Sequence, residues 1–144
     1  MATLAALKKY VNKAIRNECE RVKRLRRAHP EKKYRITDYA AAVVACGYTN
    51  SNNVFIGFSA SPVGIHFEKT ILERLEKLGT IGKKSNCCSN IIGACAEPHA
   101  ANEVLRHFSG CNMNKLQFSE AYRPRTGGRV NYCKNCKATF NEVI

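Results

Sequence analysis

The sequence predicts an α/β domain of three layers, in which a small mixed sheet is flanked by helices. Two observations lead to this prediction: segments with helical periodicity alternate with short apolar runs, and turn residues separate them. With 144 residues, the chain has the length of one domain with one buried core. No apolar run reaches the roughly 18 residues that a membrane-spanning helix needs. The first twenty residues also lack the uninterrupted apolar core of a signal peptide.

The first predicted element is a long amphipathic helix. Between Thr3 and Ala28, apolar residues recur at steps of three and four, and Pro30 follows beyond the end of this pattern. We assign residues 1–30 to this basic helix and residues 38–144 to the catalytic core of a single domain that spans 1–144. The polar face of the helix carries lysines and arginines, which by themselves indicate only a solvated surface.

Short strands and helices are predicted in alternation through the rest of the chain. The apolar run 38–48 and the alternating run 54–59 flank a turn that is rich in asparagine, which favours a β-hairpin. The later elements expected are a helix over 66–78, a helix over 97–108, a strand over 115–122, a basic loop over 123–129 and a helix from Cys133 almost to Ile144.

The formal net charge of +13 is concentrated in two parts of the chain. Residues 1–35 hold twelve basic and three acidic residues, a local net charge of +9. Residues 115–137 hold six basic residues against one glutamate, a net charge of +5, whereas residues 36–114 hold six of each sign. Such a charge distribution favours a polyanion, and we expect a nucleic acid and no membrane as the partner. From charge alone, solubility or an anionic membrane surface are the alternatives.

The eight cysteines allow more than one interpretation. Four disulfides would be typical of a small secreted scaffold, but this chain is long enough to fold without them. A Cys-x-x-Cys pair in a reducing compartment is more typical of a metal site. Sulfur bonding among Cys87, Cys88 and Cys111 is left open. Cys19 and Cys46 fall in apolar patterns and are expected to be buried free thiols.

Two motifs carry the candidate chemistry, Cys95-Ala-Glu97 and Cys133-x-x-Cys136, with 37 residues between Cys95 and Cys133. Both motifs lie at predicted helix starts, where unpaired N–H groups and the helix dipole stabilise thiolates. Three thiolates can occupy three corners of a zinc tetrahedron and leave the fourth open, which is the layout of a catalytic zinc site. Glu97 would point toward that open corner, where a carboxylate can take up and release protons.

The same two motifs resemble the zinc deaminase signature, and the chain is similar to members of the cytidine deaminase-like superfamily. Within it, the segments CAEPHAANEVL and RPRTGGRVNYCKNC are most similar to deaminase domains of bacterial polymorphic toxins. The resemblance implies that Cys95, Cys133 and Cys136 hold zinc and that Glu97 shuttles protons. Water would attack C4 of cytosine, so that ammonia leaves and uracil remains. Tyr132 departs from the family pattern, which usually has proline there.

The resemblance therefore predicts a zinc-dependent deaminase that converts cytosine to uracil in DNA. Single-stranded DNA is favoured because a duplex hides the target atom. A toxin domain of this kind would be delivered into a rival cell, act in its cytoplasm and have an immunity protein as partner. The alternatives are a deaminase of free nucleosides, of RNA or of adenine, and a non-catalytic nucleic-acid-binding module. In that module, a fourth thiolate from Cys87, Cys88 or Cys111 would close a structural zinc site.

The candidate substrate contacts are spread over the sequence. The resemblance points to Asn53, or its neighbour Asn52, at the hairpin tip for a sugar contact. His99 lies one helical turn past the first cysteine of the motif and is expected in or beside the pocket rather than as a zinc ligand. Tyrosines near the basic loop can stack on an extruded base, and its arginines can line a groove. The full set is Asn53, Ser59, Ala96, His99, Tyr122, Arg123, Arg125, Arg129 and Tyr132.

Overall fold

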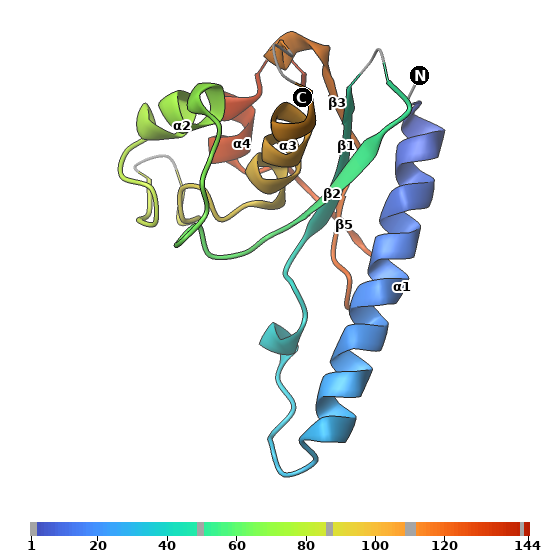
Figure 1. Cartoon of the computed structure of the whole chain (residues 1–144). Coiled ribbons are helices and arrows are strands. Elements are labelled where there is room, and N and C mark those ends of the chain that lie inside the picture. Colours follow the sequence, from blue (N-terminus) through green and yellow to red (C-terminus); the bar gives the residue numbers. More distant parts are fainter. Residues whose placement is uncertain (1–2, 49–50, 86–87, 109–111, 142) are drawn as a thin grey trace.

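A computed structural model describes residues 3–48, 51–85, 88–108, 112–141 and 143–144. In these residues the chain forms a small antiparallel sheet with helices packed on its faces, so the predicted α/β class is confirmed (Figure 1). The helices are α1 (Leu4–Ala28), α2 (Lys69–Glu76), α3 (Ala96–His107) and α4 (Lys134–Thr139), with 3-10 turns η1 (Ile36–Asp38) and η2 (Met113–Lys115). The strands are β1 (Val43–Tyr48), β2 (Val54–Phe58), β3 (Leu116–Phe118), β4 (Ala121–Tyr122) and β5 (Arg129–Val130).

Strand β1 lies at the centre of the sheet and forms the predicted hairpin with β2. The two strands pair antiparallel from Val43 opposite Phe58 to Gly47 opposite Val54. The first five residues of β1 are buried, because helices cover both of its faces. This explains why β1 reads as a continuous apolar run rather than as an alternating pattern.

The other edge of β1 pairs with β3 and then with β4. The pairing register shifts by one residue between Cys46 opposite Phe118 and Val43 opposite Tyr122. At the shift, the Ser119 hydroxyl accepts a backbone N–H of β1 at 2.9 Å. The strand predicted over 115–122 is therefore divided by a β-bulge, which the sequence pattern did not indicate.

The prediction of a mixed sheet is wrong for the described residues, in which every strand pairing is antiparallel. The strand order is β2-β1-β4-β5, and β3 also pairs with β1. In the pairs β1–β2 and β4–β5, the two strands follow one another in the sequence and pair antiparallel, and the described residues between them form no helix. The segment predicted as a basic loop ends in β5, because Gly127 turns the chain with a φ of 74°.

Helix α1 packs along one face of the sheet. Its buried stripe includes Leu7, Val11 and Ala14, which contact the side chains that β1 presents on this face. The Thr3 hydroxyl caps the helix by accepting the Ala6 N–H at 3.1 Å. The prediction of an amphipathic amino-terminal helix is confirmed, and its other face carries exposed lysines and arginines.

Helices α2, α3 and α4 pack with the opposite face of the sheet in one core. That core joins Ile71 and Leu75 of α2 to Val104 of α3 and to Phe140, which follows α4. Helix α2 begins three residues later than predicted, and α4 ends at Thr139 instead of continuing almost to the last residue.

Gly57 sets how closely α3 approaches β2. A Cβ atom at this position would collide with backbone atoms of Ala96 and Ala100, in the first turns of α3. Because the strand has no side chain there, the beginning of α3 lies directly against the sheet. This contact fixes the position of Cys95, which immediately precedes α3.

Candidate metal centre and pocket

The sulfur-bearing residues are placed by the beginnings of α3 and α4. Cys95 is the N-cap residue of α3 and Cys133 that of α4, both with extended backbone. Neither thiol caps its own helix, so both side chains are available to each other. Cys136 lies in the first turn of α4, on the same side as Cys133.

These three cysteines form one cluster. The sulfurs of Cys95, Cys133 and Cys136 all lie within 4.8 Å of one another, and the Cys95 and Cys133 sulfurs are 3.3 Å apart. In a tetrahedral zinc site with Zn–S bonds of about 2.3 Å, ligand sulfurs lie about 3.8 Å apart. The observed separations bracket that spacing, so the donor set fits a zinc ion. Among the described residues, no fourth side chain joins the cluster.

Glu97 is buried beside the sulfur cluster. Its side chain is 4% exposed, and its Oε2 atom accepts a hydrogen bond of 3.0 Å from the Cys136 thiol. Burial raises the pKa of Glu97 above that of a free glutamate, because the surroundings penalise the charged form. A carboxyl group held in this way keeps a proton more readily than a free glutamate does.

The three thiols also determine each other's ionisation. Hydrogen bonding to Cys133 raises the pKa of Cys95 to about 12, and hydrogen bonding to Cys133 likewise raises the pKa of Cys136. Conversely, hydrogen bonds from Cys136 and Cys95 lower the pKa of Cys133. Cys133 is therefore the first thiolate of the cluster, and the other two ionise only with difficulty in the absence of a cation.

A cavity of about 500 Å³ opens beside the cluster, within the size range of small-molecule sites. Cys95, Glu97 and Cys133 form part of its wall. The remaining wall residues come from the segment before β1, the end of β2, the loop before α3, and the β4–β5 hairpin with the residue after it. They are Ala41, Ala42, Ser59, Ser89, Asn90, Ile91, Ala94, Ala96, Ala121, Arg123, Val130 and Asn131.

Three of the predicted substrate contacts lie in this wall: Ser59, Ala96 and Arg123. The Ser59 hydroxyl accepts a hydrogen bond of 2.9 Å from the Ala42 N–H and thereby joins the end of β2 to the segment before β1. Ala96 lies directly between the first metal-ligand candidate and Glu97. Arg123 is exposed and brings a cation to the rim of the cavity.

Two predicted contacts from the hairpin tip and from α3 lie elsewhere. Asn53 precedes β2, at the end of the strand opposite to Ser59, and does not line the cavity. His99 is half-buried on another side of α3, where its Nε2 atom lies 3.2 Å from the carbonyl oxygen of Ala60. Burial lowers the pKa of His99. His99 is not among the clustered candidate ligands and does not line the cavity.

Three predicted contacts of the β4–β5 hairpin also lie outside the cavity wall. Tyr122 turns toward α1, where the Lys8 ammonium lies 3.2 Å from its ring centre. Arg129 forms an exposed ion pair of 3.0 Å with Glu120. Arg125 is exposed in the turn and lines no part of the cavity.

Tyr132 adjoins the cavity without lining it. Its hydroxyl donates a hydrogen bond of 2.6 Å to the carbonyl oxygen of Ser119, the residue of the β-bulge. Burial raises the pKa of Tyr132, so the phenol stays protonated and keeps this bond. Tyr132 thus joins the start of α4 to the sheet.

The sequence did not indicate the residues that hold the loop before α3. Asn135, between the two cysteines of the Cys-x-x-Cys motif, is buried and donates to the carbonyl oxygen of Asn90 at 3.2 Å. The Ser85 hydroxyl donates to the Asn135 side chain at 2.7 Å. The asparagine inside the Cys-x-x-Cys motif was the sequence feature that could have indicated this contact. A buried side-chain amide needs hydrogen-bond partners, and here they come from another segment.

The remaining cysteines divide into three groups. Cys46 is buried, as predicted, whereas the prediction of a buried Cys19 is wrong, because Cys19 is a half-buried free thiol. Cys88 is also free and does not belong to the sulfur cluster. The predictions for Cys87 and Cys111 concern residues outside the described parts of the chain.

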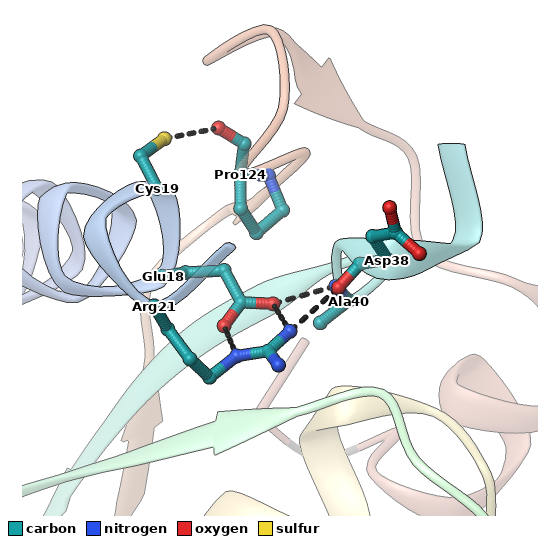
Figure 2. Close-up of polar contacts among 6 residues, drawn as sticks. All are labelled: Glu18, Cys19, Arg21, Asp38, Ala40 and Pro124. Atoms are coloured by element: carbon teal, nitrogen blue, oxygen red, sulfur yellow. Dashed lines mark hydrogen bonds and ion pairs between the residues drawn. The ribbon is translucent and has the colours of Figure 1, made fainter. Parts of the chain in front are cut away.

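Polar groups at the middle of helix α1 contact Ala40 and Pro124, which are chain neighbours of the cavity-wall residues Ala41 and Arg123 (Figure 2). The buried Glu18 carboxylate accepts two hydrogen bonds from Arg21, at 2.6 and 3.0 Å, and the Ala40 N–H at 2.7 Å. On the other side, the Cys19 thiol donates to the carbonyl oxygen of Pro124 at 3.4 Å. The helix is thus tied to the segment before β1 and to the β4–β5 turn.

Comparisons with known proteins give no further assignment. No family model matches the chain, and no curated protein or solved structure shows significant similarity to it. No helix in the described parts of the chain is both long and apolar enough to cross a membrane.

Proposed function

We propose that the protein is a zinc-dependent hydrolytic deaminase that converts cytosine to uracil in DNA, with single-stranded DNA as the favoured substrate. One observation carries this proposal: a buried carboxyl group, Glu97, contacts a cluster of three sulfurs at the wall of an open cavity. A purely structural metal site has no use for a carboxyl group in this position.

The donor set supports a catalytic rather than a structural zinc ion. Catalytic zinc sites use three protein ligands and keep one position for water or substrate, and Cys95, Cys133 and Cys136 supply three. When bound, zinc supplies Lewis acidity, which makes water a nucleophile at neutral pH.

Glu97 would move the protons of the reaction. It takes a proton from the attacking water and delivers it to the base as the C4–oxygen bond forms. It then assists the departure of the amino group when the C4–nitrogen bond breaks. The balance is one cytosine and one water consumed, and one uracil and one ammonia formed. Burial of Glu97 suits this role, because the raised pKa allows the group to hold a proton between the two steps.

The charge distribution supports a polymeric substrate. The net charge of +13, with +9 in residues 1–35, exceeds what a free nucleoside needs for binding. Arg123 at the cavity rim places one cation where a phosphate beside the target base would lie. If the chain acts like the toxin domains that it resembles, its partners include an immunity protein and its site of action is the cytoplasm of another cell.

The test compares Glu97→Gln with Glu103→Gln, a half-buried glutamate on the same helix that does not line the cavity. Zinc content is measured by elemental analysis, and uracil is measured after incubation with single-stranded DNA, duplex DNA, RNA or cytidine. We expect Glu97→Gln to keep its zinc and to lose at least about a hundredfold in uracil formation. Glu103→Gln should match the wild type.

Undiminished turnover by Glu97→Gln would reject the proposed role of this residue. A zinc-loaded wild type that releases uracil from none of the substrates would reject the function. Preference for free cytidine would reject the polymeric substrate.

A further inference from the structure

The chain turns back toward β1 after the carboxyl end of α1 (Figure 1). A second hollow lies among the residues of this turn and the last turn of α1. It has a volume of about 290 Å³, and four cations line it, Arg26, Lys32, Lys33 and Arg35, against one carboxylate, Asp38. The carboxylate is already engaged, since Asp38 accepts hydrogen bonds from Arg26 at 3.3 Å and from the Arg35 N–H at 3.1 Å. The hollow therefore presents a net positive charge to solvent.

Aromatic side chains lie beside these cations. Tyr34 lines the hollow and is 60% exposed, which is unusual for so large an aromatic residue. The guanidinium of Arg26 lies 4.5 Å from the ring centre of Tyr34 and 5.4 Å from that of Tyr39. A guanidinium beside two aromatic rings offers planar surfaces on which nucleobases can stack.

A third depression lies between the hollow and the cysteine pocket. It has a volume of about 570 Å³, and it shares Asp38 with the basic hollow and Ala41 and Ser59 with the cysteine pocket. The three adjacent depressions are here called the α1 groove. It follows the segment from the end of α1 to β1.

The middle of the α1 groove is held in place and its charges are compensated. Glu18 and Arg21 bind each other there, and Arg21 also donates a hydrogen bond of 2.6 Å to the carbonyl oxygen of Asp38 (Figure 2). The uncompensated cations of the groove thus lie at its two ends, in the basic hollow and at Arg123. A ligand with regularly spaced negative charges and planar groups between them fits this arrangement.

We propose that the α1 groove binds the strand on one side of the target base in a single-stranded nucleic acid. The proposal rests on the proposed function, because the target base occupies the cysteine pocket. Phosphates would contact Lys32, Lys33 and Arg35, and a base would stack on Tyr34. Since Glu18 and Arg26 are eight residues apart on a helix, the basic hollow lies about 12 Å beyond the middle of the groove. Only one flank of the strand can therefore reach it.

The experiment measures binding rather than turnover. Fluorescence anisotropy is recorded with zinc-loaded protein and labelled DNA strands that carry one cytosine and are extended stepwise on either the 5′ or the 3′ side. The groove variants are Tyr34→Ala and the double variant Lys32→Ala/Lys33→Ala. The matched controls are Tyr10→Ala and Lys9→Ala/Lys13→Ala, which change exposed residues of α1 outside the groove.

For the wild type, affinity should rise as nucleotides are added on one side and not on the other. Tyr34→Ala should lose about fivefold or more in affinity for the extended strand and nothing for the unextended one. The lysine double variant should lower the slope of log affinity against log salt by about 1.4 for the extended strand only. The controls should keep the gain that comes from extension on the favoured side.

Equal losses in groove and control variants, or equal gains from extension on both sides, would overturn the proposal. The proposal would also be overturned if the groove variants lost binding to anionic phospholipid vesicles but kept the one-sided gain in DNA affinity, since the groove would then bind a membrane. If the wild type shows the one-sided gain but deaminates nothing, the proposed function fails and the groove stands as a strand-binding site. If the wild type deaminates long strands but gains no affinity from extension, the proposed role of the groove is rejected and the proposed function is retained.

Discussion

The cysteine pocket and the basic end of the α1 groove are assembled in opposite ways. The pocket brings together Cys95 and Cys133, two residues from separate helices with 37 residues between them in the sequence. The basic hollow is built from residues 25–38, which are one continuous stretch of chain. The pocket thus depends on tertiary packing, whereas the basic hollow depends on the local course of the chain and on charge.

The two regions should therefore respond differently to substitution. In the pocket, buried groups such as Glu97 and Cys136 contact each other directly, and the loss of one leaves its partner without compensation. In the basic hollow, cations are exposed and act through solvent, so each one adds a graded, salt-dependent increment. The predictions below test this contrast.

The largest effect should come from a ligand of the sulfur cluster. We expect Cys136→Ser to weaken zinc binding by about a hundredfold or more, because a serine hydroxyl is a poor substitute for a thiolate ligand. The measurement is competition with a zinc-binding dye on the purified, folded variant.

Cys88→Ser is the matched control, since Cys88 is a free thiol outside the cluster. It should bind zinc as the wild type does. Equal zinc affinity of Cys136→Ser and the wild type would show that the sulfurs are not the metal centre.

The next effect concerns packing under the pocket. Gly57→Ala should lower the free energy of unfolding by about 3 kcal/mol, because the new methyl group collides with the backbone at the start of α3. Gly128→Ala, in the β4–β5 turn, meets only the Thr126 side chain at 3.3 Å and should change stability by less than about 0.5 kcal/mol. Urea denaturation of both variants checks this, and equal stability would mean that α3 does not rely on this close contact.

The contrast between the two regions also explains how much the sequence revealed. The candidate ligands and Glu97 were predictable, because metal ligands follow fixed spacings near helix starts and Cys95 and Cys133 lie at such starts. The order of helices and strands followed from periodicity. Gly57 looked like an ordinary strand residue, because the helix that requires it lies about forty residues further along the chain.

The sequence failed where a contact depends on register or on a single buried polar group. The bulge at Ser119 shifts the register by one, and no apolar pattern records such a shift. The resemblance placed Asn53 near the site, and nearness to the basic loop placed Tyr122 there. In the structure, Asn53 lies at the far end of β2 and Tyr122 lies beside Lys8 of α1. Glu18 looked like one more charge on a solvated helix, yet it is buried against the segment that forms the pocket wall.

Glu18 links the two regions, and its replacement should have an intermediate effect. Glu18→Gln should cost about 2 kcal/mol at neutral pH, because it removes the charge that binds Arg21 and the Ala40 N–H. The hydrogen bond from Arg21 lowers the pKa of Glu18 in the folded state. The stabilisation is therefore complete above the unfolded pKa of about 4.3 and is lost as the pH falls through the folded pKa.

The pH dependence gives this prediction its control. The stability difference between wild type and Glu18→Gln should be constant from about pH 5 to 7 and should shrink at lower pH. Thermal denaturation across this range measures it, and other acidic groups cancel because both proteins carry them. A difference that does not depend on pH would show that the ionised form of Glu18 is not what holds the pocket wall.

The smallest effect separates a partly buried from an exposed tyrosine hydroxyl. Tyr132→Phe should cost about 1 kcal/mol, because it leaves the Ser119 carbonyl oxygen without the donor that lies 2.6 Å away. Tyr122→Phe removes a hydroxyl that donates to the exposed Glu120 carboxylate at 3.0 Å, where water can replace it, and should cost close to nothing. Urea denaturation of the two variants, side by side, measures the difference. If both variants lost the same free energy of unfolding, the hydrogen bond between Tyr132 and the sheet would contribute no more than a solvated hydroxyl does. The start of α4 would then be held at the pocket by the sulfur cluster and by apolar packing alone.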